Sequence, residues 1–402
     1  MSRLTLIACL LLVSGILDAR PHTFIIGPVR ENMRHVLLET IIPKPRAITA
    51  PILTDAKTGK QVPCQVAVSA GNQIDVFWLV DRLAEGDTRE WKFSWSDEPS
   101  KLKERVTVEG EGEKVGVKMD GEDFTTRNAG KNARIPFFYP VLVDGKGMTR
   151  NFPMKKGVTG EREDHAHHVS FWFAHGKVNE KDFWHGKGET IVPIETKRQQ
   201  GGPVLGMLTE RHDWLSSGKK LLEDERAYCF IPLADGGRAV DVLLTLKASV
   251  GDVKFGDTKE GTFAVRVAGT MKETSGGRLT SSEGETGEKN VWGKPAAWMD
   301  CSGKVDGKNY GVTIFDHPGS FRHPTHWHAR GYGLFGANPF GYRYFYNDES
   351  KDGSHTMLKE ESITFRFRVF FHRGNVDEAA VAEAYAGYAR APRVRTYLGA
   401  LR

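Results

Sequence analysis

The chain has 402 residues, of which 39% are hydrophobic and 27% are charged, and its formal net charge is +5. This composition is typical of a globular protein. The small positive charge forms no basic run, which argues against a nucleic-acid partner, and four cysteines are too few for a disulfide-rich scaffold.

The N-terminus predicts a signal peptide over residues 1–19. Arg3 precedes an apolar run from Leu4 to Leu17, which is too short to span a membrane, and Ala19 follows as a small residue near the expected cleavage point. No later segment is apolar enough to cross a bilayer. We therefore expect a secreted or periplasmic protein with no integral membrane segment after signal cleavage.

Short β-like segments fill most of the remaining chain. Residues 20–103 predict an N-terminal accessory β domain, in which Trp91, Phe93 and Trp95 alternate along a strand with an aromatic face. Residues 104–374 predict the main domain, because short strands recur between Asp-Gly turns. This pattern favours an all-β fold, an antiparallel β-sandwich or supersandwich.

Two segments depart from the strand pattern. Residues 273–290 are polar and rich in Gly and Ser, which predicts an exposed loop. Residues 375–402 predict a C-terminal helix and tail, with the helix near 375–390, because an acidic first turn precedes an apolar stripe.

Histidines gather in two segments that are far apart in the chain. Of 14 histidines, five lie in residues 161–185 and four in residues 316–341, and both segments also contain Trp and Phe. Histidine changes charge near neutral pH and is a common metal ligand. We therefore expect the two segments to form two walls of one site.

Each segment contains a His-x-His pair. In a strand, both imidazoles of such a pair point to one side, and zinc, copper and iron sites favour imidazole. The pattern leaves open a divalent transition metal held by His165, His167 and His326. For each pair taken alone, the pattern favours instead that these histidines bond to carbonyl groups and pack against tryptophans, since short metal motifs often mislead.

Carboxylates near the histidines suggest acid–base chemistry, in which one group donates a proton and another accepts one. We expect His168 and His328 as the acid–base groups and Glu260 as the opposing carboxylate. Arginine, amide and aromatic side chains could orient and stack on a polyhydroxylated ligand. The predicted substrate-binding residues are Trp172, His175, Arg266, Arg330 and Asn338.

Four motifs resemble an exported bacterial family that carries the label "methane oxygenase PmoA". They are DHAHHVSFWFAHG at 164–176, GDTKEG at 256–261, GKPAAW at 293–298 and HPTHWHARGYGLFGANPFG at 323–341. The resemblance extends from about residue 25 to 375. One departure is Val169, which stands where the motif has Arg.

This resemblance implies a secreted β-sandwich of the galactose mutarotase-like supersandwich type, a fold found among sugar-degrading functions. The true methane oxygenase subunit is an integral membrane protein, so we do not expect methane oxidation from a chain without a membrane span.

The sequence thus predicts a secreted carbohydrate-active enzyme, an epimerase, lyase or hydrolase, whose partner is a small or polymeric carbohydrate. Two alternatives stay open: a metal-dependent oxidoreductase with copper, iron or zinc, and a non-catalytic carbohydrate-binding module. Metal analysis separates the oxidoreductase from the others. Variants that lose turnover but keep ligand binding separate the enzyme from the binding module.

Overall fold

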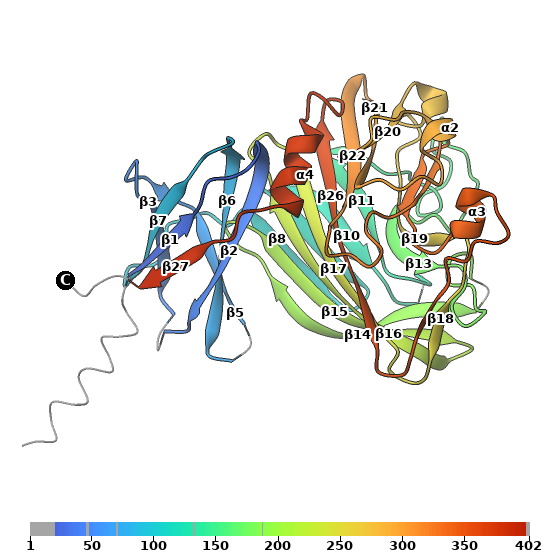
Figure 1. Cartoon of the computed structure of the whole chain (residues 1–402), viewed down its shortest axis with the longest axis horizontal. Coiled ribbons are helices and arrows are strands. Elements are labelled where there is room, and N and C mark those ends of the chain that lie inside the picture. The colour runs from blue at the N-terminus through green and yellow to red at the C-terminus, as the bar shows by residue number, and fades with distance from the viewer. Residues whose placement is uncertain (1–20, 46–47, 70, 132, 187, 399–402) are drawn as a thin grey trace, which may run out of the picture. The chain divides into compact units, whose positions relative to one another are not determined.

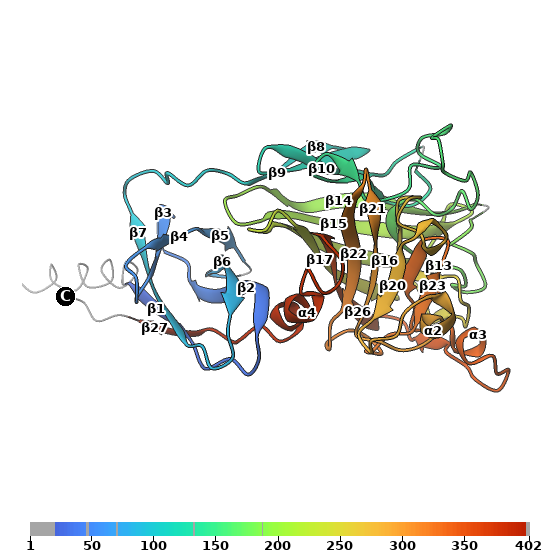
Figure 2. The same cartoon turned by 90° about the horizontal axis from the view of Figure 1, so that it is seen from above.

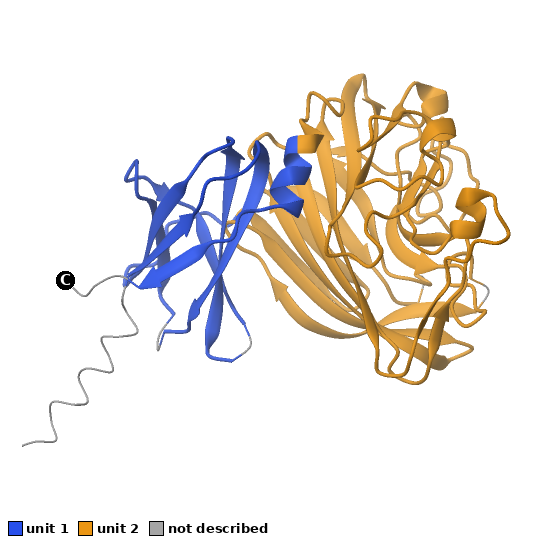
Figure 3. Cartoon of the chain, in the orientation of Figure 1, with its two compact units in different colours: residues 1–104, 383–402 blue, residues 105–382 orange. Residues whose placement is uncertain are grey.

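The computed structural model describes residues 21–45, 48–69, 71–131, 133–186 and 188–398. The predicted signal peptide, residues 1–19, lies outside this range. The chain divides into two compact units (Figure 3), residues 1–104 with 383–402 and residues 105–382. The first unit therefore includes a C-terminal segment that the sequence analysis had placed in a separate tail.

The first unit contains a five-stranded sheet, in the order β27-β1-β7-β3-β4, and a three-stranded sheet, in the order β2-β6-β5. Its strands are β1 (His22–Ile26), β2 (Met33–Pro43), β3 (Ala50–Asp55), β4 (Gln61–Val62), β5 (Cys64–Val68), β6 (Gln73–Leu83), β7 (Arg89–Ser96) and β27 (Arg395–Leu398). The aromatic alternation predicted for β7 is confirmed. Trp91 and Phe93 are buried, and Trp91 packs against Trp78 with 5.2 Å between ring centroids.

The second unit contains two large sheets (Figures 1 and 2). The nine-stranded sheet has the order β23-β24-β19-β13-β11-β10-β9-β8, with β12 paired to β11. Its strands are β8 (Val106–Glu111), β9 (Lys114–Met119), β10 (Glu122–Asn128), β11 (Phe137–Val143), β12 (Lys146–Gly147), β13 (Phe171–His175), β19 (Gly261–Arg266), β23 (Trp327–Arg330) and β24 (Leu334–Ala337).

The eight-stranded sheet has the order β14-β15-β16-β17-β26-β22-β21-β20. Its strands are β14 (Glu189–Gln200), β15 (Gly206–Ser216), β16 (Lys219–Pro232), β17 (Arg238–Lys247), β20 (Arg278–Ser281), β21 (Trp298–Val305), β22 (Lys308–Asp316) and β26 (Ser362–Arg373). A short separate pair joins β18 (Val253–Phe255) to β25 (His355–Met357). Neighbouring strands pair antiparallel, so the predicted all-β antiparallel fold is confirmed.

The core of the second unit lies between these two sheets. Phe263 on β19 stacks on Phe367 on β26 with 4.4 Å between ring centroids, and Phe173 on β13 lies 5.8 Å from Phe365. Each such buried aromatic side chain contributes about 1.5–3 kcal/mol of hydrophobic stabilisation. Because side chains alternate along a strand, the neighbours of these residues point away from the eight-stranded sheet. We call that side the outer face.

The C-terminal helix is present but shorter than expected. Helix α4 spans Val381–Ala389, whereas the apolar stripe predicted a start near residue 375. The side chain of Asn375 accepts the backbone N–H groups of Asp377 and Glu378, and Ala380 has a φ of 48°. Side-chain bonding to the backbone stabilises a turn in place of the first helical residues.

The predicted exposed loop at residues 273–290 is wrong. This segment contains the 3₁₀ helix η2 (Glu273–Ser275), the strand β20 and the start of helix α2 (Glu288–Val291). Strand β20 pairs with β21, and its last three residues are buried. Pairing with a distant strand outweighed the local Gly and Ser content. Helix α2 packs against β20 and β23, and the short helix α3 (Tyr342–Tyr346) follows β24 in the chain.

No helix in the described part of the chain is long and apolar enough to cross a membrane.

Candidate functional site

One row of residues crosses the outer face of the nine-stranded sheet. The strand register pairs Phe137 with Trp172, Trp172 with Ala264, Ala264 with Gly336, and Gly336 with His328. We call these five residues the outer row. Strands lie about 4.8 Å apart, so Trp172 and His328 are separated by roughly three spacings, or about 14 Å. Of the two residues between Trp172 and His328 in this row, only Ala264 has a Cβ atom, because position 336 is glycine.

The two histidine-rich segments meet over this row. The ring of His165 stacks on Tyr332, with 5.2 Å between centroids and 17° between planes. His165 also stacks on His168 at 4.9 Å, and His167 lies 4.3 Å from both His168 and His185. The two histidine-rich segments therefore lie side by side in the fold, as expected, and that they form two walls of one site stays a prediction.

The geometry predicted for His165 and His167 is wrong. These residues lie in a turn that precedes β13, where the N–H of His168 donates to the carbonyl of His165 at 2.9 Å. His165 has a φ of 47°, in the left-handed region. Strand periodicity does not apply to a turn, so the spacing of this pair does not place both imidazoles on one strand face.

A carboxylate joins two arginines beneath the histidine cluster. Oδ1 of Asp164 accepts a hydrogen bond from Nη1 of Arg150 at 2.7 Å and lies 3.3 Å from Nη2 of Arg266. Burial opposes ionisation of Asp164, but hydrogen bonds from His165 and Arg150 outweigh it and lower the pKa. Arg150 was missed by the sequence analysis, because it lies outside both histidine-rich segments and in no recognisable motif.

Arg266 connects this carboxylate to His168 and Tyr332. Its Nη1 lies 3.3 Å from Nδ1 of His168, and its guanidinium lies 4.3 Å from the centroid of the Tyr332 ring. Burial, and then the charge of Arg150, lower the pKa of Arg266 to about 10. Burial also lowers the pKa of His168, whose imidazole is therefore neutral. Because His168 is buried and contacts Arg266, it positions that guanidinium and does not face solvent.

At the other end of the outer row, His328 meets the loop that contains Glu260. His328 is 4% exposed, lies edge-on to Trp292 at 5.0 Å, and forms a hydrogen bond with the backbone of Lys259. Glu260 is the next residue, and its charge contributes to raising the pKa of Tyr332, after burial. Burial, followed by Arg330, lowers the pKa of His328 to about 3. The structure thus places His328 against the loop that contains Glu260.

Arg330 lies beside this pair. Its guanidinium is 5.1 Å from the Trp292 ring centroid and 5.6 Å from that of Tyr332, and its Nε lies 2.9 Å from Oε1 of Glu288. Glu288 also accepts the N–H of Gly331 at 2.6 Å. The sequence analysis did not select Trp292 or Glu288. Glu288 lies in the segment predicted to be an exposed loop, and Trp292 follows it.

Three buried ring nitrogens on the outer face have no hydrogen-bond partner among the described residues. They are Nε1 of Trp172, Nε1 of Trp184 and Nδ1 of His328. Trp184 packs against Trp172 with 5.1 Å between centroids, which places it on the same face. Buried polar groups in native proteins almost always find a partner. These nitrogens are therefore candidates for bonds to a ligand.

Two of the predicted substrate-binding residues, His175 and Asn338, form hydrogen bonds within the protein. His175 points into the core between Phe255 and Phe340, and its Nε2 bonds to the carbonyl of Gly256 at 2.9 Å. The side-chain amide of Asn338 donates to the carbonyl of Thr258 and accepts the N–H of Phe340. Both side chains are engaged in hydrogen bonds to the backbone, so the prediction that they contact substrate is not supported.

Trp172 is also less accessible than expected. It is 2% exposed and is covered by His168, at 5.5 Å with 24° between ring planes, and by Trp184. Its ring face is not open for a sugar to stack on. Tyr332 and Trp292 are more exposed than Trp172, since both are half-buried.

The predicted metal ligands do not fit a metal ion. Within the described residues, no group of three or more His, Cys, Asp or Glu side chains could hold one. His165 and His167 lie in the turn before β13. Nε2 of His326 lies 2.9 Å from the hydroxyl of Tyr346, and its ring stacks on Phe345 at 5.8 Å. The set His165, His167 and His326 is not assembled, because one His-x-His pair is in a turn and His326 packs against α3.

His175 gives a prediction about the effect of pH on stability. Burial lowers its pKa in the folded protein to about 4, so below about pH 6.5 the unfolded chain binds a proton that the folded chain excludes. Acid therefore favours unfolding, and His175 accounts for a loss of about 2 kcal/mol between about pH 7.5 and pH 5. Urea unfolding gives the free energy of unfolding at both pH values. Between them, His175→Gln should lose about 2 kcal/mol less of this free energy than wild type does. An unchanged difference between the two pH values would contradict it.

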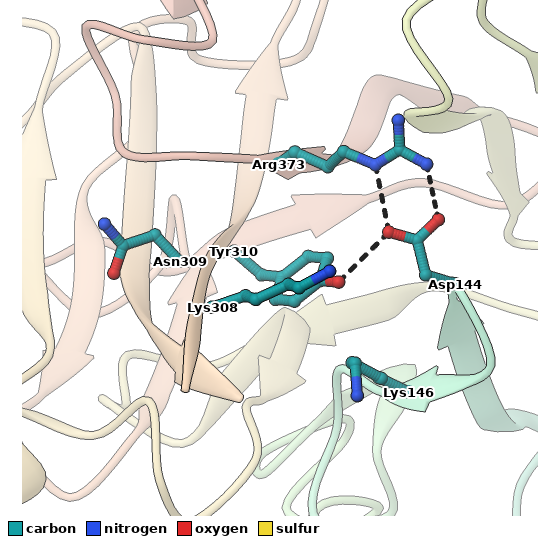
Figure 4. Close-up of a pocket in the computed structure, with 6 residues that line it drawn as sticks. All are labelled: Asp144, Lys146, Lys308, Asn309, Tyr310 and Arg373. Atoms are coloured by element: carbon teal, nitrogen blue, oxygen red, sulfur yellow. Dashed lines mark hydrogen bonds and ion pairs between the residues drawn. The ribbon is translucent and has the colours of Figure 1, made fainter. Parts of the chain in front are cut away.

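A pocket of about 530 Å³ lies away from these residues (Figure 4), lined by Asp144, Lys146, Lys308, Asn309, Tyr310 and Arg373. Arg373 bonds to both carboxylate oxygens of Asp144, and the hydroxyl of Tyr310 donates to the same group at 3.0 Å. The pocket's carboxylate is thus used to tie strand ends together. None of the predicted site residues lines it.

Comparisons with known proteins give a family but no activity. A family model described as "Family of unknown function (DUF6807)" matches residues 114–386. No curated protein matches the chain.

Two solved structures resemble the chain weakly. A protein in the glycosyl hydrolase family 38 from Enterococcus faecalis has 12% identity and a TM-score of 0.42, over 96% of this chain and 48% of that one. An alpha-mannosidase from Enterococcus faecalis V583 has 13% identity and a TM-score of 0.42, over 95% and 47%. The chain spans about half the length of these proteins. Similarity at this level carries no argument about function.

Proposed function

We propose that this chain, which belongs to the family of unknown function DUF6807, is an exported carbohydrate-active enzyme. It binds a sugar on the outer face of its nine-stranded sheet and acts on it as an epimerase, lyase or hydrolase by acid–base chemistry. His328 and Glu260 are the reacting groups, and Arg266 and Arg330 orient the sugar.

The observation that carries this proposal is the meeting of His328 with the Glu260 loop. The hydrogen bond between His328 and the backbone of Lys259 fixes the imidazole, and its Nδ1 has no partner within the described residues. A neutral imidazole with a free ring nitrogen can accept a proton. The carboxyl group of the adjacent residue, Glu260, supplies or takes the other proton, and such a pair is the minimum for general acid–base catalysis.

The surrounding side chains suit a polyhydroxylated ligand. The guanidinium groups of Arg266 and Arg330 donate several hydrogen bonds in a fixed plane, and each lies over an aromatic ring, that of Tyr332 for the first and Trp292 for the second. In this arrangement His168 acts on Arg266 as a positioning residue.

Product analysis tests the proposal. Purified protein is incubated with a panel of glycosides, uronic acid polymers and neutral polysaccharides, and products are identified by mass spectrometry and sugar NMR. A sugar converted to a new product supports the enzyme. A sugar that binds without conversion supports the alternative of a binding module. Turnover that requires an added transition metal supports the oxidoreductase.

The pH profile of the converted substrate provides a prediction about His328. Its folded pKa of about 3 keeps the imidazole neutral well below its ordinary pKa of about 6.5. Protonation of His328 should therefore cause no loss of kcat/KM between about pH 7 and pH 5. The profile is measured in wild type and in Glu260→Gln, which removes the carboxylate. An acid limb near pH 6.5 in both would show that a different histidine is the base.

A further inference from the structure

A second pocket, of about 290 Å³, lies next to the histidine cluster. Its lining includes Ile135, Phe137, Met154 and Val169, together with His167 and Arg134. Four of these six side chains are apolar. The pocket is therefore different in character from the charged surroundings of His328 and Glu260.

The strand register connects this pocket to the candidate site. Phe137 is the first residue of the outer row, and it pairs directly with Trp172. The row then continues through Ala264 and Gly336 to His328. His167, which also lines the pocket, lies 4.3 Å from the ring of His168. The pocket is thus at the opposite end of one continuous row from the proposed acid–base pair.

The two polar lining residues do not make the pocket a site for a charged group. The guanidinium of Arg134 donates to the carbonyl groups of Phe183 and Trp184, each at 2.8 Å, so its hydrogen bonds are directed into the chain. Burial, followed by the neighbouring charge of His185, lowers the pKa of His167 to about 3, which leaves its imidazole neutral. An apolar group would be preferred here, since water is displaced from apolar side chains.

We propose that this pocket holds an apolar, ring-sized substituent of the substrate, such as an aryl group attached to the sugar. This inference rests on the proposed function, because the substrate would extend past the histidine cluster from His328 to the pocket. Phe137 and His328 are four strand spacings apart, or roughly 19 Å, so the substrate would be an oligosaccharide with the substituent at its far end. The size is sufficient, since an apolar cavity of about 150 Å³ accepts benzene. Burial of an aromatic ring should tighten binding by about tenfold to a hundredfold relative to a methyl group.

The test compares p-nitrophenyl glycosides with methyl glycosides of the same oligosaccharides, and includes p-nitrophenol alone. Binding is followed by the methyl NMR signal of Met154, which is assigned with Met154→Leu. We expect the aryl compounds to shift this signal and to bind at least tenfold more tightly than the methyl compounds. Val169→Asp, which places a charge in the pocket, should remove that preference. Val250→Asp changes a valine that is 53% exposed and should keep it.

A second variant guards against misfolding of Val169→Asp. Ala166 is exposed at the pocket lining, so Ala166→Trp should fold and fill the space, again removing the preference for aryl compounds. Equal affinity for aryl and methyl glycosides, or a preference that survives Ala166→Trp, would overturn the inference. If no sugar binds, the proposed function fails, and a p-nitrophenol shift that is lost in Ala166→Trp still establishes the aryl site. If sugars are converted without an aryl preference, only the pocket inference fails.

Discussion

Replacement of Glu260 by glutamine, or of His328 by alanine, is expected to lower kcat by about a hundredfold to ten-thousandfold on the sugar that the protein converts. Glutamine keeps the size of Glu260 but cannot exchange a proton at neutral pH. Alanine removes the imidazole whose Nδ1 is without a partner among the described residues. Initial rates and ligand affinity are measured together, and affinity should change much less than kcat.

A matched control uses a glutamate far from this role. The side chain of Glu349 is 86% exposed, so Glu349→Gln should retain the wild-type rate. Circular dichroism and thermal unfolding establish that each variant is folded. Near-wild-type rates in both Glu260→Gln and His328→Ala would refute the assignment and favour the binding-module alternative.

The largest stability effect is expected at Asp224, in the core of the second unit. Its carboxylate accepts the indole N–H of Trp214 at 2.7 Å and a guanidinium N–H of Arg226 at 2.6 Å, and it lies 2.8 Å from Nδ1 of His212. Asp224→Asn keeps the shape but leaves the buried Arg226 charge without its counter-charge. Breaking a buried ion pair in this way typically costs about 3–5 kcal/mol of unfolding free energy. Urea unfolding at neutral pH measures the loss.

An exposed aspartate provides the control for this prediction. Asp123 pairs with Lys118 at 3.4 Å, and the two side chains are 76% and 55% exposed. Exposed pairs contribute about 0–1 kcal/mol, so Asp123→Asn should unfold at nearly the wild-type urea concentration. If Asp224→Asn lost no more stability than Asp123→Asn, the ion pair would contribute nothing measurable to the fold.

Acid should reduce the contribution of Asp224 in wild type. Burial opposes its ionisation, but Arg226 and His212 outweigh burial and hold the pKa below the usual range. A depressed carboxyl pKa gives stability that is complete above the unfolded value of about 4 and is lost as pH falls towards the folded value. Near neutral pH the difference between wild type and Asp224→Asn should therefore be at its full size.

Local sequence patterns were sufficient to predict the all-β class. Alternation in β7 places Trp91 and Phe93 inside because a strand has a period of two whatever it pairs with. Residue chemistry was also sufficient to select His328 and Glu260 as candidates, since only a few side-chain types can transfer a proton. The segments that contain them do meet in the folded chain.

The roles of individual histidines depended on the tertiary structure. His175 faces the core and Trp172 the outer face, because β13 pairs His175 with Gly261 and Trp172 with Ala264, about 90 residues away. A shift of one residue in that register would exchange the two faces. No pattern within residues 161–185 contains this information.

The same reason explains the residues that the sequence analysis missed. Arg150 and Glu288 lie in segments without histidine-rich motifs, and each acquires its place through an ion pair, with Asp164 for Arg150 and with Arg330 for Glu288. The sequence by itself determined the strand content and the chemically dense segments, because these depend on near neighbours in the chain. Only the tertiary structure decided which side chains share the outer face, because strand pairing joins residues that are distant in the sequence.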